Sequence, residues 1–468
     1  MTNPTPRRSA ASRKAFSGAR QLALNVLLQV QAGAYADVAL HRTLAQVQPG
    51  EGDSAGERSA ERAFATELVY GTVRRQRTLD ALIDQLGTRP ADKQPPVLRL
   101  LLHLGLYQLR YLAGVPASAA VNTSVELAKA NGLGKLAGVV NGLLRQYDRQ
   151  AADGKDPLAL PEDPVAQLGI RHSYPDWLIA LWLDQLGPEE TEQICQWFNQ
   201  VPTIDLRVNR DRATADTVQT AFTAAGIAVE HLAGIPFGLR LVNHQGALTN
   251  LPGYSEGWWS VQDASAQLVG LLLDPQPGDT VLDTCAAPGG KATQIAEIVG
   301  SDGRVWACDR APSRLKKIAA NAQRLGLSNL HTHAGDSTEL GQFYQSADRV
   351  LVDAPCSGLG TLHRHADARW RQSEAAIADL SKLQSALLAE AARCVKPGGT
   401  LVYATCTLHP AENEAVIEAF CQAHPSWRIV PPGPSFGAGL EIAPQGWIKV
   451  WPHRSAMDGF FMARLQQA

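Results

Sequence analysis

The sequence lacks the features that mark membrane and secreted proteins. None of its apolar stretches approaches the ~18 residues that a membrane-spanning helix requires. The first twenty residues contain five Lys and Arg and no acid, but no apolar segment of the signal-peptide type follows them. We therefore expect no membrane partner and no secretory signal. Residues 1–20 are interpreted as a disordered basic arm, with a transit peptide as the alternative.

Paired cysteine spacings are also missing. The chain has seven cysteines, an odd number, without a CxxC motif or a cluster of Cys and His. This pattern argues against a disulfide framework and against a zinc site. We expect a reducing, cytoplasmic environment and no metal centre. Four of the cysteines, Cys195, Cys308, Cys394 and Cys421, are interpreted as small buried apolar residues.

The small net charge of −2 hides an uneven distribution. Residues 1–150 carry 19 Lys and Arg against 11 Asp and Glu, a net charge of +8. Residues 151–260 carry a net charge of −8, and residues 261–468 a net charge of −2. A basic block joined to a near-neutral one is typical of a polyanion-binding module attached to a second function. The candidates for phosphate contacts in the basic block are Arg74, Arg75, Arg77, Arg99 and Arg110.

The pattern of apolar residues divides the 468-residue chain into three regions after the arm. Residues 21–150 show apolar residues at helical spacing and no strand pattern, which predicts an all-helical domain. Residues 160–257 combine linker helices with a small α+β unit of the RRM or ferredoxin-like type. Over residues 258–468, short β-rich runs alternate with helices, which predicts a largely parallel, doubly wound α/β sheet. The predicted fold class is therefore multidomain, with all-α, α+β and α/β parts in that order.

The α/β part begins with a candidate nucleoside site. A strand that ends at Asp283 runs into the turn Pro288–Gly290 and then into a helix, so that backbone N–H groups can approach a ligand. Twenty residues after Gly289, the next strand ends in Asp309, the spacing of an acid that accepts hydrogen bonds from ribose hydroxyls. The turn lacks GxGxxG, which argues against a dinucleotide and against a nicotinamide dehydrogenase.

Acidic residues also follow the next two strands. Asp336 ends the third strand and Asp353 the fourth, so that three successive strands end in an acid at the same edge of the sheet. Each acid alone is more often a helix cap or a turn residue. Together they predict a polar pocket for adenosine and a base, in which Asp353 hydrogen-bonds the edge of a cytosine.

Two cysteines lie where parallel strands end, the edge at which open sheets bind ligands. Cys356 follows the fourth strand and Cys406 the fifth. A thiolate that adds to carbon 6 of a pyrimidine makes carbon 5 nucleophilic enough to take a methyl group from a sulfonium, and loss of the carbon 5 proton then expels the thiolate. We therefore predict covalent catalysis by a cysteine, although spacing alone does not decide which of the two attacks.

Several ordered motifs resemble the Sun (NSUN-type) family of RNA cytosine-C5 methyltransferases. These motifs are SVQDASAQL at 260–268, CAAPGGK at 285–291, DAPCSG at 353–358, ATCT at 404–407 followed by ENE at 412–414, and DGFF at 458–461. The basic block, with ERAFATELVYG and LHLGLYQLRYL, resembles the NusB-like RNA-binding domain. The resemblance covers the whole chain and implies a Rossmann-like methyltransferase domain at its carboxyl end. Thr407 stands where serine is common, but it keeps a hydroxyl.

The resemblance assigns roles to individual residues. It implies that Cys406 is the nucleophile and that Cys356 assists release of the methylated product. It also implies a pocket for S-adenosylmethionine lined by Cys285, Ala286, Ala287, Pro288, Gly289, Gly290, Lys291, Asp309, Asp336 and Asp353.

The fusion of a NusB-like domain to such a catalytic domain implies a substrate. That substrate is 16S rRNA, bound before or early in assembly of the small ribosomal subunit, with a target of the cytosine-967 type. A tRNA or DNA cytosine methyltransferase is the alternative within the class, and the helical basic block favours structured RNA over DNA. A non-catalytic RNA-binding factor is the alternative outside it, against which the two cysteines and the glycine turn argue. The oligomeric state is left open.

Overall fold

The structure, a computed structural model, describes residues 18–46, 55–242, 246–433, 436–437 and 439–467. It divides into two compact units. The first comprises Met1–Asn199 with the short segment His365–Arg371, and the second comprises Gln200–Arg364 with Gln372–Ala468. Most of the predicted arm lies outside the described residues, and helix α2 already begins at Ala19. No helix among the described residues combines the length and apolar character needed to cross a membrane.

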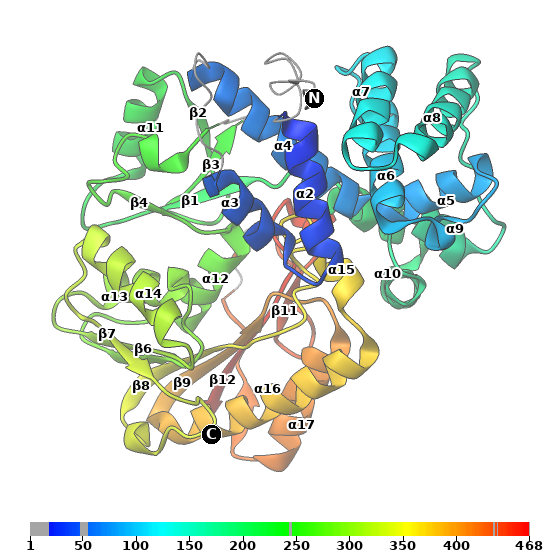
Figure 1. Ribbon diagram of the computed structural model, residues 1–468. Helices are drawn as coiled ribbons and strands as arrows, with labels where there is room; N and C mark the ends of the chain where they lie inside the picture. The colour runs from blue at the N-terminus through cyan, green and yellow to red at the C-terminus, as the bar shows by residue number, and fades with distance from the viewer. Residues whose placement is uncertain (1–17, 47–54, 243–245, 434–435, 438, 468) are drawn as a thin grey trace, which may run out of the picture. The chain divides into compact units, whose positions relative to one another are not determined.

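The first unit is built from helices, as the apolar spacing predicts. In α6, Leu101 and Leu102 are fully buried, and Gly105 lies where any side chain would collide with Leu144 of α8. The described elements of this unit (Figure 1) are α2 (Ala19–Gln31), α3 (Ala36–Gln46), α4 (Ala55–Arg74), α5 (Gln76–Leu86), η1 (Ala91–Lys93), α6 (Pro96–Tyr111), α7 (Ala117–Ala130), η2 (Gly134–Leu136), α8 (Ala137–Ala152), α9 (Pro164–His172), α10 (Asp176–Trp197) and α15 (Ala368–Arg371).

The segment His365–Arg371 belongs to this helical unit although it comes from a much later part of the chain. Arg369 has no exposed surface; its guanidinium donates to Oδ1 of Asn199 at 3.0 Å and lies 4.2 Å from the centroid of the Tyr174 ring. The indole nitrogen of Trp370 donates to a backbone carbonyl of α4 at 2.8 Å. These buried polar contacts fix the segment against the helices.

The second unit begins with a small antiparallel sheet whose strand order is β2-β3-β1-β4. Its elements are β1 (Ile204–Val208), α11 (Ala215–Ala224), β2 (Ala228–His231), β3 (Gly238–Val242), η3 (Leu248–Asn250) and β4 (Trp259–Val261). The predicted α+β character is confirmed. The boundaries differ, however: β4 lies beyond residue 257, and α9 and α10 group with the helical unit.

A larger sheet follows, with the strand order β10-β12-β9-β8-β5-β6-β7 and β11 paired to β12. Strands β5 to β9 run parallel, as predicted, and β10 to β12 add antiparallel pairs that the alternation did not show. The strands are β5 (Thr280–Asp283), β6 (Arg304–Asp309), β7 (Leu330–Ala334), β8 (Ala347–Asp353), β9 (Val395–Thr405), β10 (Trp427–Ile429), β11 (Ile448–Val450) and β12 (Phe460–Gln467).

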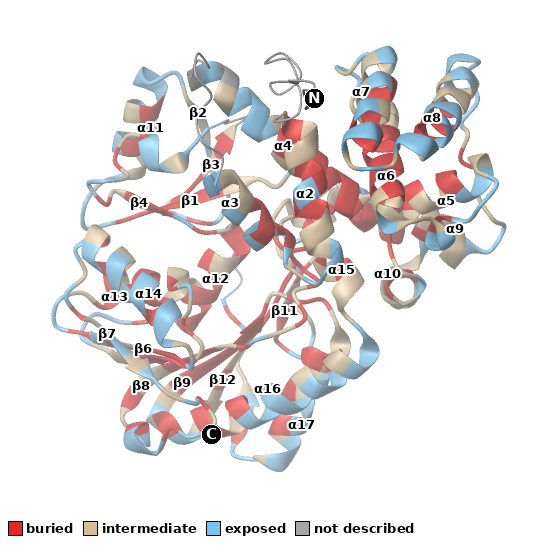
Figure 2. Ribbon diagram, viewed as in Figure 1, coloured by how far each residue is buried: buried red, intermediate tan, exposed pale blue. Residues whose placement is uncertain are grey.

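Helices cover both faces of the large sheet, because its strands are apolar on both sides. Leu351 packs in the core with α12, α13 and α14, whereas its neighbours Val350 and Val352 pack with α16 and α17. The central strands are accordingly buried (Figure 2). The helical elements are α12 (Ala264–Leu273), α13 (Gly290–Val299), α14 (Pro312–Leu325), η4 (Gly341–Phe343), α16 (Glu374–Cys394), η5 (Pro410–Glu412), α17 (Glu414–Ala423) and α18 (Pro452–Ser455).

Arg207 of β1 ties the small sheet to the glycine turn of the large one. Its buried guanidinium donates to the carbonyl of Gly290 at 2.6 Å, to Oγ1 of Thr293 at 3.0 Å and to Oε1 of Glu297 at 2.8 Å. Burial raises the pKa of Glu297, and the nearby charge of Arg207 opposes that rise. The two sheets of this unit are therefore joined by a buried ion pair, which holds the first turn of α13.

Replacing Arg207 by leucine is expected to lower the free energy of unfolding by about 3–5 kcal/mol, because Glu297 would stay buried without its counter-charge. The double variant Arg207→Leu, Glu297→Leu should recover most of that loss. Urea denaturation followed by tryptophan fluorescence measures both variants. Equal losses in the single and double variants would show that the pair does not act as a unit.

Candidate active site

The carboxyl ends of the parallel strands bring the predicted polar residues to one edge of the large sheet. Asp309 ends β6 and Asp353 ends β8, and these strands flank β5, which ends at Asp283. Cys406 directly follows β9, the parallel neighbour of β8. The prediction that Asp309, Asp353 and the two cysteine loops follow neighbouring strands at one edge is confirmed, whereas Asp336 does not end its strand, because β7 already ends at Ala334.

The turn between β5 and α13 requires glycine at its tip. The peptide bond between Ala287 and Pro288 is cis, and Gly289 has a φ of 104°, a left-handed conformation that favours glycine. A Cβ on Gly289 would also lie 3.0 Å from Ile318. The guanidinium of Arg314 donates to the carbonyl of Ala287 at 2.8 Å and closes the turn from the α14 side.

Asp283 is the acid of this edge that the sequence motifs did not single out. It is fully buried, and burial together with the charge of Asp353 raises its pKa to about 8. Within the described residues its two carboxylate oxygens make no hydrogen bond of ordinary geometry. A buried polar group without a partner is costly, so this carboxyl group is suited to accept donors from a bound ligand.

Asp309 and Asp336 differ in their surroundings. The buried Asp309 accepts from the backbone N–H of Ala311 at 2.8 Å and pairs with Arg314 at 2.9 Å, at the end of β6. Asp336 is exposed; hydrogen bonds from the backbone and hydroxyl of Thr338 lower its pKa. Asp336 thus has a local turn role in the structure, and its part in a cofactor pocket stays a prediction.

Lys291 connects the glycine turn to the strand that carries Asp353. Its Nζ lies 2.7 Å from Oδ2 of Asp353 and 4.9 Å from the centroid of the Phe460 ring. Burial disfavours the charged ammonium, but the carboxylate of Asp353 outweighs burial, so the pKa of Lys291 is raised. The carboxylate is therefore held at the pocket edge by a fixed positive charge, and Phe460 brings the DGFF motif into the same site.

The two cysteines of the predicted mechanism are in contact. Sγ of Cys356 lies 3.3 Å from Sγ of Cys406. The hydrogen bond to Cys406, together with burial, raises the pKa of Cys356 well above its ordinary value. Cys356 is thus held as a neutral thiol that can donate to the neighbouring sulfur. Cys285 is a different case, because burial raises its pKa to about 12 and no second thiol is bonded to it.

The side chain of Glu412 connects the loops that carry Cys356 and Cys406. Its side chain has no exposed surface, and its Oε1 accepts from the backbone N–H of Ser357 and from Nε2 of Gln384, both at 2.9 Å. The Ser357 hydroxyl donates to the other carboxylate oxygen and lies 2.7 Å from the Thr407 hydroxyl. Each cysteine is followed directly by one of these hydroxyl residues, so one buried acid fixes both loops.

The loop that carries the DGFF motif meets the two cysteine loops through backbone contacts of Gly360, which follows Cys356 in the chain. Its N–H donates to the carbonyl of Cys406 at 3.0 Å, and its carbonyl accepts from the N–H of Gly459 at 2.8 Å. A side chain at Gly360 would collide with the carbonyl of Gly459. The close approach of three backbones therefore requires glycine here, and it places the DGFF motif against the Cys406 loop.

Arg364 bonds to one acid in each of the two remaining motifs, SVQDASAQL and DGFF. Its Nε donates to Oδ1 of Asp458 at 2.8 Å, and its Nη2 donates to Oδ2 of Asp263 at 3.0 Å. Burial together with the charge of Asp458 raises the pKa of Asp263 to about 7. SVQDASAQL and DGFF therefore meet at one arginine through Asp263 and Asp458.

Most of the arginines predicted to contact phosphates form internal ion pairs or other contacts within the helical unit. Arg77 pairs with Asp176 at 2.7 Å, Arg99 with Asp80, and Arg110 with Asp156 at 2.7 Å, while Arg74 is buried. Arg75 stacks on the Tyr111 ring with its guanidinium carbon 4.6 Å from the centroid. The prediction for these five arginines rests on their charge alone, and the structure shows that most of this charge is neutralised within the helical unit.

Comparison with protein families gives the site a context. The model described as 16S rRNA methyltransferase RsmB/F matches residues 270–466. The NusB family model matches residues 17–149, and the ferredoxin-like domain of the RsmF/B-like methyltransferases matches residues 174–247.

Whole-chain relatives decide the family. The probable ribosomal RNA small subunit methyltransferase B of Synechocystis sp. is 50% identical over 454 residues, which cover 96% of this chain and 99% of the relative. The chain belongs to the ribosomal RNA small subunit methyltransferase B family. The Bacillus subtilis member, also named probable, is 37% identical over 87% of this chain and 90% of its own length.

Solved structures share the fold of this methyltransferase family. The crystal structure of PH0851 superposes with a TM-score of 0.77 at 25% identity and covers 96% of this chain and 98% of its own. NSun6 from Pyrococcus horikoshii, crystallised with SFG, gives a TM-score of 0.57 at 21% identity and covers 63% of this chain and 99% of its own. The predicted class is thereby confirmed: a NusB-like helical domain, a ferredoxin-like domain and a Rossmann-like methyltransferase domain.

S-adenosylmethionine is the cofactor of this methyltransferase family. The residues at the sheet edge fit it, because the glycine turn, the unpartnered carboxyl of Asp283 and the buried carboxylate of Asp309 offer what an amino acid group and a ribose require.

Asp283, Glu412, Gly360 and Arg364 are the site residues that the sequence reasoning missed. The motif ENE contains two acids, Glu412 and Glu414, and the sequence alone does not show that Glu412 is the buried one.

Replacing Glu412 by glutamine is expected to lower kcat on the order of 100-fold, because an amide would point a donor at the donors of the cysteine loops and displace the thiols. The affinity for S-adenosylmethionine should be unchanged. Glu418→Gln, an exposed position on α17, is the matched control. Steady-state methylation and calorimetric titration of the cofactor separate the two effects; a kcat equal to that of the control variant would remove Glu412 from its positioning role.

Proposed function

We propose that this chain transfers a methyl group from S-adenosylmethionine to carbon 5 of a cytosine in 16S rRNA. The proposed target is of the cytosine-967 type. The observation that carries the proposal is the contact of two thiols, 3.3 Å apart, beside the Lys291–Asp353 ion pair at the cofactor edge of the sheet. A single thiol would suffice for nucleophilic attack, whereas a pair also supplies a donor for the departing sulfur.

In the proposed reaction, Cys406 is the nucleophile. Its thiolate adds to carbon 6 of the base, which breaks the double bond between carbons 5 and 6 and makes carbon 5 nucleophilic. Asp353, held by Lys291, accepts a hydrogen bond from the exocyclic amino group of the cytosine and so orients the base for attack. When bound, the cofactor supplies an electrophilic methyl group.

Release is the proposed task of Cys356. Solvent water takes the carbon 5 proton, the electron pair of that C–H bond restores the double bond between carbons 5 and 6, and the bond between carbon 6 and Sγ of Cys406 breaks with its electron pair on sulfur. The raised pKa of Cys356 keeps it a thiol, so that it can donate a hydrogen bond to the sulfur that leaves as a thiolate. The two cysteines therefore act at different steps, in line with the roles that the family resemblance implies.

The substrate and its assembly state are part of the proposal. The relatives are named as small-subunit rRNA methyltransferases, and the residues 1–150 of this chain carry a net charge of +8, which favours a polyanion. We propose that the RNA is bound before or early in subunit assembly, in the cytoplasm. Because the five arginines named above are mostly paired internally, we expect other basic residues to contact phosphates.

The two cysteine variants are expected to behave differently with RNA and cofactor. Cys406→Ala should abolish both methyl transfer and any covalent adduct, because the attacking sulfur is gone. Cys356→Ala should allow attack and methylation but delay release, so a protein–RNA adduct should accumulate and survive denaturing electrophoresis. Cys421→Ala, a position outside the sheet edge, is the control.

Two results would count against this scheme. An adduct in Cys406→Ala with none in Cys356→Ala would reverse the roles of the two cysteines. Normal turnover in both variants, without any adduct, would rule out the covalent mechanism.

A further inference from the structure

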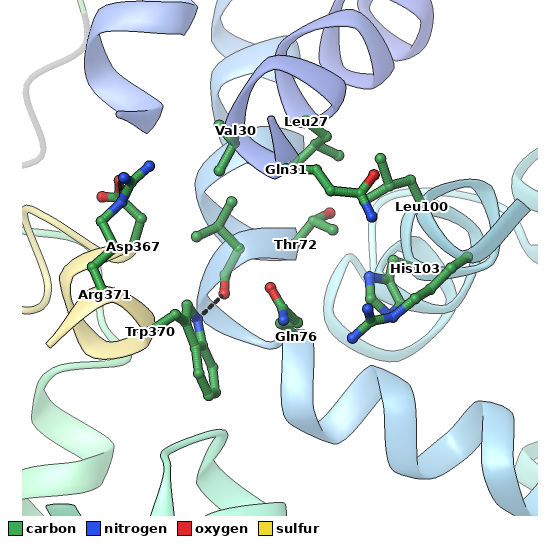
Figure 3. Close-up of a pocket in the computed structure, with 12 residues that line it drawn as sticks. Leu27, Val30, Gln31, Thr72, Gln76, Leu100, His103, Asp367, Trp370 and Arg371 are labelled. Carbon is green, nitrogen blue, oxygen red and sulfur yellow. Dashed lines mark hydrogen bonds and ion pairs between the residues drawn. The ribbon is translucent and has the colours of Figure 1, made fainter. Parts of the chain in front are cut away.

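The helical unit contains a cavity of about 310 Å³ (Figure 3), and neither cysteine of the thiol pair lines it. Helices α2, α4, α5 and α6 form most of its wall, and the segment His365–Arg371 completes it. Its volume falls at the lower end of the range for pockets that bind small organic ligands. Nothing in the proposed methyl transfer uses this cavity.

Unpaired polar groups mark the cavity as a binding site. Thr72 is 1% exposed, yet within the described part of the chain its hydroxyl has no hydrogen-bond partner. Gln76 and Gln31 line the same space, and the hydrogen bonds within the described residues include none from their side-chain amides. Figure 3 shows Thr72, Gln31 and Gln76 around the same opening. A buried hydroxyl without a partner is rare, and a molecule bound in the cavity would supply the missing partner.

The charged groups of the cavity neutralise one another. Arg99 forms a two-point ion pair with Asp80, which also accepts from Nε2 of His103 at 2.8 Å. Arg371 pairs with Asp367 at 2.9 Å. No lining cation is therefore left to select an anion such as phosphate, and no lining anion to select a cation. The groups that stay available are neutral ones that both donate and accept.

The rest of the wall is apolar and aromatic. Leu27, Val30 and Leu100 face the cavity together with the indole of Trp370, whose nitrogen is fixed by a hydrogen bond to the carbonyl of Val73 at 2.8 Å. Apolar walls combined with neutral donors and acceptors match a planar heteroaromatic ring with a hydrogen-bonding edge. Proteins recognise unpaired RNA bases in this way.

We propose that this cavity binds one unpaired nucleobase of the RNA substrate, as a recognition site separate from the cytosine that is methylated. The proposal rests on the proposed function in so far as the ligand is part of an RNA. Asp367, Trp370 and Arg371 belong to the stretch that follows the Cys356 loop in the chain. Part of the cavity wall therefore comes from a segment that is continuous with the Cys356 loop.

The test uses the full-length chain and the double variant Thr72→Val, Gln76→Leu, which keeps the shape of both side chains and removes their hydrogen bonds. Loss of two neutral hydrogen bonds should raise the KM for 16S rRNA about 30-fold, with kcat at saturating RNA and cofactor affinity unchanged. Thr66→Val, on the same helix but with its hydroxyl bonded to the carbonyl of Arg62, is the control. Because the Thr72 hydroxyl is unpaired, its removal should not lower the melting temperature.

Two further arms identify the ligand. RNA carrying 4-thiouridine or 6-thioguanosine at unpaired positions should crosslink to the peptide that contains Thr72 or the one that contains Trp370, and the crosslink should be lost in the double variant. Titration with the four free nucleosides, with the cofactor site saturated by S-adenosylhomocysteine, tests the other source of the same chemistry. Saturable nucleoside binding that the double variant loses, without any change in the KM for RNA, would assign the cavity to a free metabolite and overturn the proposal.

An unchanged KM for RNA in the double variant, with no crosslink in the cavity, would overturn it as well. This failure is distinct from failure of the proposed function, because the adduct of Cys356→Ala reports on the thiol pair alone. An adduct without a cavity crosslink removes the recognition site and leaves the methyl transfer. A cavity crosslink without an adduct keeps the recognition site and removes the covalent mechanism.

Discussion

The buried carboxylate of Glu412 is the constraint on which the catalytic geometry depends. It has no exposed surface and accepts hydrogen bonds from Ser357 and Gln384, while Thr407 lies within reach of the same group. A buried charge without such donors costs several kcal/mol, so the donors from the Cys356 loop and from α16 stabilise Glu412 in this position. The separation of 3.3 Å between the sulfurs of Cys356 and Cys406 follows from satisfying this one acceptor.

The other features of the methyltransferase unit build outward from this pair of loops. The parallel sheet brings β8 and β9 side by side, and the contacts of Gly360 add the DGFF motif as a third loop. Lys291 then links that motif and Asp353 to the glycine turn, and Arg207 fixes the turn to the small sheet. The glycine turn, Asp353 and the thiol pair are thus positioned by one connected set of polar contacts.

The sequence predicts the parts of this arrangement that local patterns encode. Alternating apolar strands and helices define the doubly wound sheet, and strand ends place Asp309, Asp353 and Cys406 at one edge. Local patterns do not show which distant residues will contact each other, so the sequence did not predict these contacts. Glu412 meets Ser357 across 55 positions, and Trp370 meets Val73 across 297. Charge patterns also mislead, because an arginine that is paired internally looks the same in sequence as one that is free to bind phosphate.

The central claim is that a buried acid holds two thiols as a working pair, and mild oxidation of the native full-length chain tests it most directly. Diamide treatment followed by peptide mapping shows which of the seven cysteines become linked. A bond between Cys356 and Cys406 should form first, and it should form much more slowly in Glu412→Gln. Absence of this link in the native chain, or an equal rate in the variant, would contradict the account.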